Sequence, residues 1–362
     1  MKTRKHKLAF KFLLLLIIAV NMPLNLFADA YQNPGGIQDY SNGLIYGYTS
    51  NYNELYVIHV SDTTIGILNI PSEVKWEDYY GYYKTSKVTS IHGIDYETWN
   101  PYTIFYPLYL QCINIPETVT SIKEGIFFPH YLRITSGPDI YDDSHLAELM
   151  EINVDPANPN FTSVDGVLYN KDKSVLIACP PARTECDIPA SVTQIANYAF
   201  AGCRNMKSLT IPNTITQIGA SAFEDCVNLQ NITIPESVSA IGDHAFKDCK
   251  SLVAIDLPNS LDSIGEHMFE NCKSLVSVKL PTSLTSLGNY SFMDCESLVS
   301  IDLPASLNSI GDYVFENCKS LASVDLPASL TSIGEHAFEN CKSLVSVKLP
   351  TSLTSLGNYS FM

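Results

Sequence analysis

Positive charge is scarce in this 362-residue chain, which has 22 Lys and Arg against 38 Asp and Glu and a formal net charge of −16. Nucleic-acid binding depends on Lys and Arg that neutralise phosphates, and anionic membrane surfaces attract the same residues. The composition therefore argues against nucleic acid and against an anionic membrane surface as partners. It suits a soluble protein whose copies repel one another.

The motifs of common enzyme classes are also missing. The chain has no G-x-S-x-G, H-E-x-x-H, C-x-x-C or glycine-rich phosphate loop. Serine is abundant but recurs at equivalent positions, and no unique serine is matched to a unique histidine and acid. We therefore expect no enzymatic activity, no catalytic residue, no cofactor and no metal site.

A long apolar run occurs only near the N-terminus, at residues 12–20, where five basic residues precede it and Ala28-Asp29-Ala30 follows it. The run is shorter than the roughly 20 residues that a membrane span needs, and the arrangement is typical of a secretory signal peptide. We predict a signal peptide over residues 1–30, a secreted or cell-surface location, and no membrane insertion after cleavage. Cleavage would leave 17 basic and 37 acidic residues, a net charge near −20.

What the chain has in abundance is one repeat of 23 residues, which runs from residue 188 to residue 362 without an insertion or deletion. Three residue types mark it in register. The phenylalanines are Phe200, Phe223, Phe246, Phe269, Phe292, Phe315, Phe338 and Phe361; the cysteines are Cys203, Cys226, Cys249, Cys272, Cys295, Cys318 and Cys341; the prolines are Pro189, Pro212, Pro235, Pro258, Pro281, Pro304, Pro327 and Pro350.

Each repeat contains Leu-x-x-Ile/Val-x-Leu/Ile-Pro, as in Leu252-x-x-Ile255-x-Leu257-Pro258. The alternation predicts a short strand, which proline ends because it has no N–H to donate. A glycine such as Gly265 follows, and a tight turn there would need a positive φ or a close approach of the backbone, both of which glycine allows. We then expect a short helical or 3₁₀ segment that carries the phenylalanine. A fixed period of roughly 20–29 residues with this core predicts a leucine-rich repeat solenoid with short parallel strands.

The N-terminal half has the same pattern in a looser form. We expect a β-hairpin cap over residues 31–64, with antiparallel strands at 44–48 and 54–60, because the open end of a solenoid exposes a strand edge. Irregular leucine-rich repeats with insertions follow over residues 65–187, including a hairpin over residues 161–177. Regular repeats occupy residues 188–362, and no linker interrupts this single elongated domain.

The last repeat is truncated and is not a diverged cap. Residues 349–362 repeat residues 280–293 letter for letter, and residues 257–293 and 326–362 differ at three positions. Terminal repeats normally diverge to cover the core. We therefore expect a longer natural chain, whose missing part would carry the cap and a surface anchor.

The cysteine column has two interpretations, namely disulfide or metal chemistry and a stack of buried free thiols. The cysteines recur singly and have no histidine at ligand spacing, which favours thiols that act as small buried apolar groups. A disulfide between Cys179 and Cys186 is a less favoured alternative that the sequence leaves open.

The outward-facing strand positions form two columns of small and charged residues. They are a candidate binding face for an extended protein or glycan, and they would line a concave surface if the solenoid curves as leucine-rich repeats do. The alternative is a solvated strand face, because aromatic and Arg anchors are missing. The candidate residues are Ser208, Thr210, Asn231, Thr233, Asp256, Ser277, Lys279, Ser300, Asp302, Ser323, Asp325, Ser346 and Lys348.

A third column carries aromatic residues and histidines, and we interpret it as a half-exposed aromatic ladder, with a metal site at His244 and His267 as the minor alternative. The tyrosine-rich segment 76–109, with Trp76 and Trp99, could bind glycans or proteins, although covering the core is the preferred interpretation. The third column consists of Tyr198, Ser221, His244, His267, Tyr290, Tyr313, His336 and Tyr359.

The run Ile-Pro-Ala-Ser-Val-Thr-Gln-Ile-Ala-Asn-Tyr-Ala-Phe-Ala-Gly-Cys over residues 188–203 resembles the repeat of the BspA-like leucine-rich repeat surface protein family. Residues 158–172 resemble a hairpin insert common in that family. The resemblance implies an exported surface protein of oral or gut bacteria, treponemes or mucosal protozoa. The chain departs from the pattern at Ala196, where later repeats have glycine, and in the insertions between residues 72 and 150.

Some members of that family act as adhesins for fibronectin or fibrinogen, or in aggregation between bacteria. The resemblance therefore implies macromolecular binding, with host extracellular matrix or cell-surface proteins as partners, and glycans or other bacteria as further ones. The alternative function is a passive structural spacer that displays a C-terminal module missing from this chain.

Overall fold

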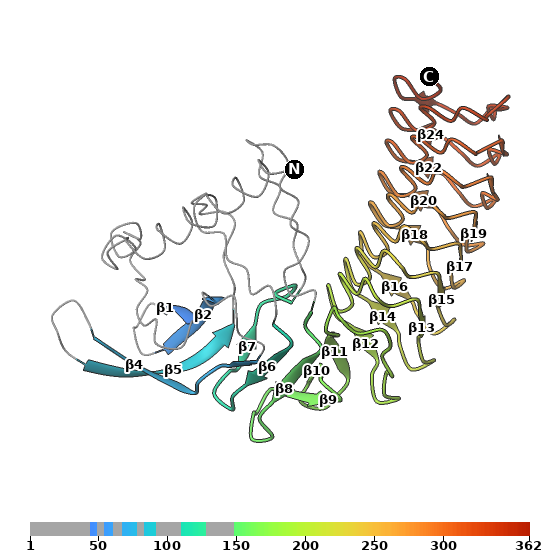
Figure 1. The fold of residues 1–362 in the computed structure, drawn as a ribbon. Helices are drawn as coiled ribbons and strands as arrows, with labels where there is room; N and C mark the ends of the chain where they lie inside the picture. The colour runs from blue at the N-terminus through green and yellow to red at the C-terminus, as the bar shows by residue number, and fades with distance from the viewer. Residues whose placement is uncertain (1–43, 49–53, 61–66, 78–82, 92–109, 128–147) are drawn as a thin grey trace, which may run out of the picture.

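A computed structural model describes residues 44–48, 54–60, 67–77, 83–91, 110–127 and 148–362 of the chain. These residues form a β-solenoid that bends between its N-terminal and C-terminal parts (Figure 1). The predicted signal peptide, the turn at residues 51–53 and most of the tyrosine-rich segment lie outside the described residues. The leucine-rich repeat solenoid predicted from the sequence is confirmed.

The N-terminal part contains a mixed sheet and a parallel one. The predicted strands at 44–48 and 54–60 are confirmed as antiparallel β1 and β2, and β2 then pairs in parallel with β5. β5 also pairs with antiparallel β4 and parallel β7, while β3, β6 and β8 form a parallel sheet. The bounds are β1 Leu44–Tyr48, β2 Glu54–Val60, β3 Ile67–Asn69, β4 Glu73–Glu77, β5 Tyr83–Ile91, β6 Cys112–Ile115, β7 Ser121–Ile122 and β8 Glu151–Val154.

An antiparallel meander joins this part to the regular repeats, which confirms the hairpin predicted at 161–177. Its strands are β9 (Phe161–Val164), β10 (Val167–Asn170) and β11 (Val175–Ala178). β11 pairs in parallel with β12, the first strand of the regular repeats. Within this sheet, antiparallel pairing therefore changes at β11 to the parallel stacking of the regular repeats.

Each regular turn contributes a strand before its proline and a shorter strand after it. We call the two stacks the pre-proline ladder and the post-proline ladder. The pre-proline ladder contains β13 Ser208–Thr210, β15 Asn231–Thr233, β17 Ala254–Asp256, β19 Ser277–Lys279, β21 Ser300–Ile301 and β23 Ser323–Val324.

The post-proline ladder continues from β11 and consists of short strands. Each residue pairs with its counterpart one repeat later, as Ser286 pairs with Ser309. Neighbouring turns therefore lie at strand spacing, about 4.8 Å. This ladder contains β12 Gln194–Ile195, β14 Gln217–Ile218, β16 Ala240–Ile241, β18 Ser263–Ile264, β20 Ser286–Leu287, β22 Ser309–Ile310, β24 Ser332–Ile333 and β25 Ser355–Leu356.

The segment that carries the phenylalanine consists of turns, and the described residues contain no helix. The sequence predicts short helical or 3₁₀ segments here. Alternate N–H groups instead donate to the next turn of the solenoid, as Ser221, Phe223 and Asp225 do to carbonyls 22 residues ahead at 2.8–2.9 Å. Ser221 and Asp225 also have positive φ, which helices do not tolerate. Bonding between turns thus replaces bonding within a helix.

The core consists of columns in which one residue per turn stacks on its counterpart. The phenylalanine rings from Phe200 to Phe361 stack with centroid distances of 5.1–5.6 Å. Stacked apolar rings bury large areas and keep successive turns in register. A second, smaller core lies under β3, β6 and β8, and the two cores meet at the meander.

The cysteine column consists of free, buried thiols, as the favoured interpretation predicts. Each thiol from Cys226 to Cys341 donates to the carbonyl oxygen of the phenylalanine one turn earlier, at 3.1–3.2 Å. Burial raises the pKa of these thiols, for example to about 12 for Cys341. They are therefore unreactive structural groups.

The glycine column is explained by close approach of neighbouring turns. A Cβ on Gly288 would lie 2.7 Å from the backbone of Gly265, and one on Gly219 would lie 2.5 Å from the backbone N of Asn197. The glycines with positive φ among the described residues, Gly125, Gly166 and Gly202, do not belong to this column. Ala196 can replace glycine in the first turn because the chain beneath it is β11, to which its N–H donates.

Candidate binding face

The thirteen predicted residues all lie exposed on the turns of the pre-proline ladder, and we keep the name binding face for this set. In β17, for example, the strand alternates so that Ile255 is buried and Asp256 points outward. Strand pairing places Ser208 beside Asn231, Thr210 beside Thr233, and Asp256 beside Lys279. Strand pairing therefore places successive members of each column side by side in the paired strands.

The curvature differs from the one that the sequence predicts. β13, β15, β17 and β19 lie along the outer side of the bend, away from the N-terminal part (Figure 1). The expected concave location of the binding face is therefore wrong. The turns on the opposite side approach one another, which agrees with the short backbone contacts of the glycine column. A convex face suits a partner that lies across the array rather than one that is enclosed by it.

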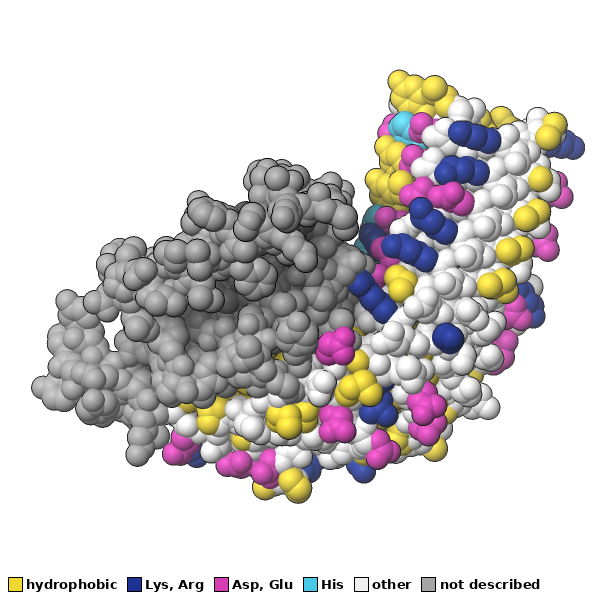
Figure 2. All heavy atoms as spheres, in the orientation of Figure 1, with side chains coloured by type: hydrophobic (Ala, Val, Ile, Leu, Met, Phe, Trp, Pro, Cys, Tyr) yellow, Lys and Arg dark blue, Asp and Glu magenta, His cyan; other side chains and the backbone are white. Residues whose placement is uncertain are grey.

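A row of exposed valines borders the binding face, and the sequence reasoning missed it. Val253, Val276 and Val299 are 43–48% exposed, and Val345 is exposed as well. Their backbones bond from turn to turn, with Val276 N to Val253 O at 2.8 Å. We call this set, with Ala322 at the fourth position, the valine ridge. Exposed hydrophobic side chains recur from turn to turn in Figure 2.

The valine ridge supplies the apolar component that the two polar columns lack. Its members follow directly after the repeated Leu of each turn, which is buried or, at Leu344, partly buried, at a position where exposure to water predicts a polar residue. A valine recurring there is the feature of the sequence that could have revealed the ridge. Met150 occupies the equivalent position before β8 and is 47% exposed, so the apolar row has a counterpart in the irregular repeats. Exposed apolar rows of this kind are typical of interaction surfaces.

The aromatic ladder predicted from the third column is confirmed. The rings of His244, His267, Tyr290, Tyr313 and His336 stack on one another with centroid distances of 4.5–4.9 Å. Tyr359 ends the stack at 5.0 Å. Every member of the column, including Tyr198 and Ser221, has a φ of 53–61°. The faces of the rings contact the rings of neighbouring turns, so mainly the ring edges are accessible.

Charged side chains next to the aromatic ladder bond to one another between turns. Glu270 accepts from Lys247 at 2.9 Å and pairs with Nδ1 of His267 at 2.6 Å. His336 and Glu339 form the equivalent pair three turns later. Burial, followed by the nearby charges of Glu339 and Asp294, raises the pKa of Glu316. These groups stabilise the stacking of turns.

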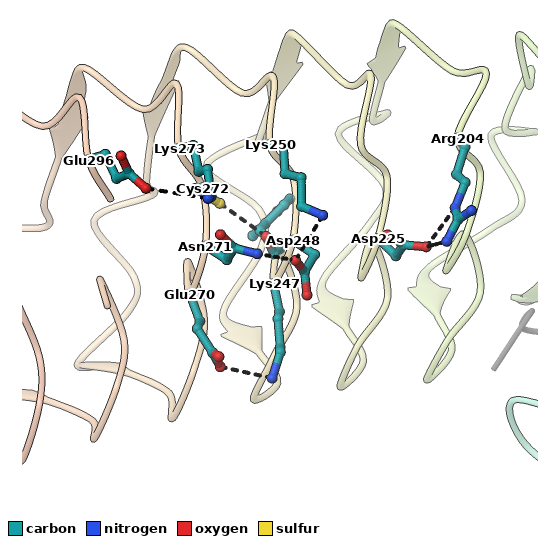
Figure 3. Close-up of polar contacts among 11 residues, drawn as sticks. Arg204, Asp225, Lys247, Asp248, Lys250, Glu270, Asn271, Cys272, Lys273 and Glu296 are labelled. Atoms are coloured by element: carbon teal, nitrogen blue, oxygen red, sulfur yellow. Dashed lines mark hydrogen bonds and ion pairs between the residues drawn. The ribbon is translucent and has the colours of Figure 1, made fainter. Parts of the chain in front are cut away.

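A second set of polar contacts lies beside the cysteine column (Figure 3). The Arg204 guanidinium donates to the buried carboxylate of Asp225 at 2.6 and 2.8 Å. Other residues make the contacts in later turns. The Asn271 side chain donates a hydrogen bond to Asp248, and Lys273 forms an ion pair with Glu296 at 3.3 Å. Each contact joins two successive turns, which indicates a role in the solenoid itself.

The alternative sites considered from the sequence have these outcomes. Within the described ranges, no group of three or more His, Cys, Asp or Glu side chains is placed to hold a metal ion. Of the tyrosine-rich segment, the backbone of the end of β4 and of all of β5 is described, but Trp76 and Trp99 lie outside the described side chains. Among the described residues there is also no helix with the length and apolar character of a membrane span.

The fold and its exposed face define a leucine-rich repeat protein. The family model for the BspA type leucine-rich repeat region matches residues 49–134, 179–299 and 240–362, with six copies of the region. The chain therefore belongs to the BspA-type leucine-rich repeat family, as the sequence resemblance predicts. No curated protein matches the chain.

Solved structures of bacterial leucine-rich repeat proteins are similar to it. One is a leucine-rich repeat protein from Eubacterium ventriosum, with 24% identity, a TM-score of 0.60, and coverage of 89% of this chain and 98% of that one. Another is a leucine-rich cell surface protein from Faecalibacterium prausnitzii, with 21% identity, a TM-score of 0.38, and coverage of 86% and 94%. The pneumococcal vaccine antigen PcpA is 17% identical, with a TM-score of 0.41 and coverage of 89% and 98%. The Eubacterium protein supports the fold.

Proposed function

We propose that this protein is exported to the cell surface and mediates adhesion by binding other macromolecules, such as host matrix proteins or proteins on other cells. The observation that carries the proposal is the outer side of the solenoid, where the binding face and the valine ridge repeat at one register from turn to turn. This surface combines apolar, small polar and charged columns.

The repetition supports adhesion for a physical reason. A single turn presents only one half-exposed valine, one small polar residue and one charged residue, which is too little for tight binding. Linked equivalent sites bind together with an effective concentration set by their spacing, so weak contacts combine into strong attachment. The array of turns is stiff, because each turn is bonded to the next, and binding would therefore not require it to become ordered.

Export is supported by the first 30 residues of the sequence. Five basic residues, a short apolar run and Ala28-Asp29-Ala30 form the pattern that secretion machinery recognises and cleaves. The acidic composition is compatible with an exported protein that stays soluble. Membership of a leucine-rich repeat family suits protein binding, and the partners named above come from the sequence resemblance.

The test is binding of the purified chain to immobilised fibronectin, fibrinogen and whole bacterial cells, measured against an unrelated acidic protein. The test variant replaces Val253, Val276 and Val299 by serine. We expect it to bind at least about tenfold more weakly, because three valine side chains would no longer contribute apolar area to the interface. Circular dichroism and thermal unfolding would show that it remains folded.

A matched control replaces Tyr290, Tyr313 and His336 by serine, which the fold already accommodates at Ser221. We expect this control to bind like the wild type. Loss of binding in the control alone would move the site to the aromatic ladder. No saturable binding of the wild-type chain to any of the three targets would contradict adhesion and favour the structural spacer.

A further inference from the structure

Two cysteines lie outside the regular thiol column. Cys179 follows β11 directly, and Cys186 lies two residues before Ile188, where the regular repeats begin. The side chains are 3% and 8% exposed and belong to the larger hydrophobic core. The loop between them passes over the place where the two cores meet.

The surroundings of these thiols differ from those of the other buried cysteines. The thiols from Cys226 onward each donate to a phenylalanine carbonyl, whereas the thiol of Cys179 is in hydrogen-bond contact with the thiols of Cys186 and Cys203. Cys203 begins the regular column, and its thiol is directed to the carbonyl oxygen of Cys179 at 3.8 Å. Cys179 and Cys186 are therefore facing thiols that are close in the sequence, and Cys203 is the competing partner of Cys179.

We propose that Cys179 and Cys186 form a disulfide when the chain folds in an oxidising compartment. The oxidant is a disulfide, either that of a thiol–disulfide oxidoreductase or oxidised glutathione. A thiolate of one cysteine attacks it, giving a mixed disulfide and one thiol of the oxidant. The second cysteine then displaces the remaining oxidant sulfur, so that two protein thiols are oxidised, one disulfide is reduced to two thiols, and no other reactant is needed.

The reaction belongs to folding rather than to the folded state. Seven positions separate the cysteines, so their loop closes early and at little entropic cost. Two consecutive prolines, Pro180 and Pro181, further restrict the conformations of the loop. In the folded chain the hydrogen bond with Cys179, together with burial, raises the pKa of the Cys186 thiol. The hydrogen bond with Cys186 lowers the pKa of the Cys179 thiol, but the contact with Cys203 and burial raise it above the ordinary value, so neither thiol forms the reactive thiolate readily. A bond formed early would then be protected from exchange.

The bond would stabilise the junction between the meander and the regular repeats. Cys179 N–H donates to Ala199 O at 2.7 Å, and Ala182 N–H donates to Leu149 O at 3.0 Å, so the loop already contacts both neighbouring turns. A covalent link across this loop would prevent it from opening and would hold the first regular turn against β11. Inside a cell the reaction requires export and so rests on the proposed function, but with the purified chain it does not.

The test is to refold the full chain with reduced and oxidised glutathione, and in parallel with excess dithiothreitol. Remaining thiols are alkylated, and the chain is digested with trypsin and Asp-N. Trypsin cleaves after Arg183 within the loop, and Asp-N cleaves before Asp187. A disulfide between Cys179 and Cys186 therefore links peptide 174–183 to peptide 184–186, whereas a bond to Cys203 links it to a peptide from 187–204.

We expect the 174–183 to 184–186 link after glutathione refolding and none after dithiothreitol. Cys203→Ala should keep the link and Cys186→Ala should abolish it. The melting temperature of the oxidised chain should be several degrees higher than that of the reduced chain. Alkylation of both cysteines after glutathione refolding, or a link to the 187–204 region, would overturn the proposal even if adhesion were confirmed. A chain that is never exported would leave the glutathione result unchanged and contradict the proposed function alone.

Discussion

The carbonyl oxygens of the buried phenylalanines from Phe200 to Phe315 accept two hydrogen bonds each. Phe223 O, for example, accepts from the N–H of Cys226 at 3.2 Å and from the thiol of Cys249 at 3.2 Å. The backbone N–H already pairs one lone pair of this carbonyl oxygen, and the thiol pairs the second, so a small donor is favoured at this buried position. This preference explains why the column contains cysteine, which is small, apolar and a weak donor.

One buried hydroxyl has no such partner. Ser291 is fully buried, and its Oγ has no hydrogen-bond partner among the described residues, while Ala222, Ala245 and Ala337 occupy the same position in other turns. Ser291→Ala should raise the free energy of unfolding by about 1 kcal/mol, because it removes an unsatisfied polar group. Urea denaturation would measure the change.

The control is Ser360→Ala at the same position of the last turn, where Oγ donates to Gly334 O at 3.0 Å. This substitution should not stabilise the chain. Equal effects of the two substitutions would show that the hydrogen-bonding environment does not decide the outcome.

The glycine column makes a second prediction at single residues. Gly288→Ala should lower the free energy of unfolding by about 2–4 kcal/mol, because the new methyl group would overlap backbone atoms of the preceding turn that cannot move separately. Gly265→Ala should be milder, since its Cβ would first meet the movable Oδ1 of Asp243, with the backbone at 3.3 Å. Thermal and urea unfolding of both variants would test the order, and a larger loss for Gly265→Ala would contradict it.

His244 makes stability depend on pH. Burial lowers its pKa from the ordinary value of 6.5, and the positive charges of His267 and Lys247 lower it further, against Asp243 and Glu270. His244 therefore binds a proton more tightly in the unfolded chain than in the folded chain. The stability that neutral His244 contributes to the folded chain is lost as pH falls through 6.5.

His244→Tyr removes the titration and keeps a stacking ring that is native at Tyr290. We therefore expect the decrease in melting temperature between pH 7.5 and pH 5.5 to be smaller in His244→Tyr than in the wild type. An unchanged decrease would show that His244 does not contribute to it.

Among the elements, the turn segments are the part that the sequence did not reveal. The pre-proline strands, the hairpin and the glycine contacts follow from alternation, proline and spacing, and all were predictable. The turns were not, because positive φ at Tyr290 or Asn271 depends on bonds to the next turn, which a local pattern does not contain. The exposure of the thirteen outward-facing residues was predicted residue by residue, whereas their convex position depends on how closely the two sides of each turn pack.

The same turn segments contain the buried pair of Arg204 and Asp225, which shows how one turn is bonded to the next. Arg204→Ala should lower the free energy of unfolding by about 3 kcal/mol, because a buried carboxylate would lose its charged partner. Asp225→Asn should recover most of this loss in the double variant, since Asn occupies the equivalent left-handed position at Asn271 and Asn317. A double-mutant cycle by urea denaturation measures the coupling, and no recovery would contradict the charge argument.

At the scale of the whole molecule, the register of the repeats predicts which deletions are tolerated. Removing residues 270–338 deletes three whole turns and joins Phe269 to Glu339. The register is kept, because Glu339 takes the place of Glu270 after a phenylalanine. We expect a folded, shorter solenoid with reduced stability, because each turn contacts only its neighbours. Removing residues 270–327, about two and a half turns, should unfold the C-terminal part. Circular dichroism and proteolysis would distinguish the two, and equal behaviour would contradict register as the determinant.

The hydrogen bonds between turns also determine how the protein would respond to mechanical force. When the chain is pulled from its two ends, the bonds of the outermost turn carry the load before those of the turn beneath it. The solenoid should then peel one turn at a time, and each 23-residue turn would release about 80 Å of chain at a similar force. A tether of this kind lengthens under flow and keeps its tension nearly constant, so sudden drag is absorbed before it reaches the attachment points.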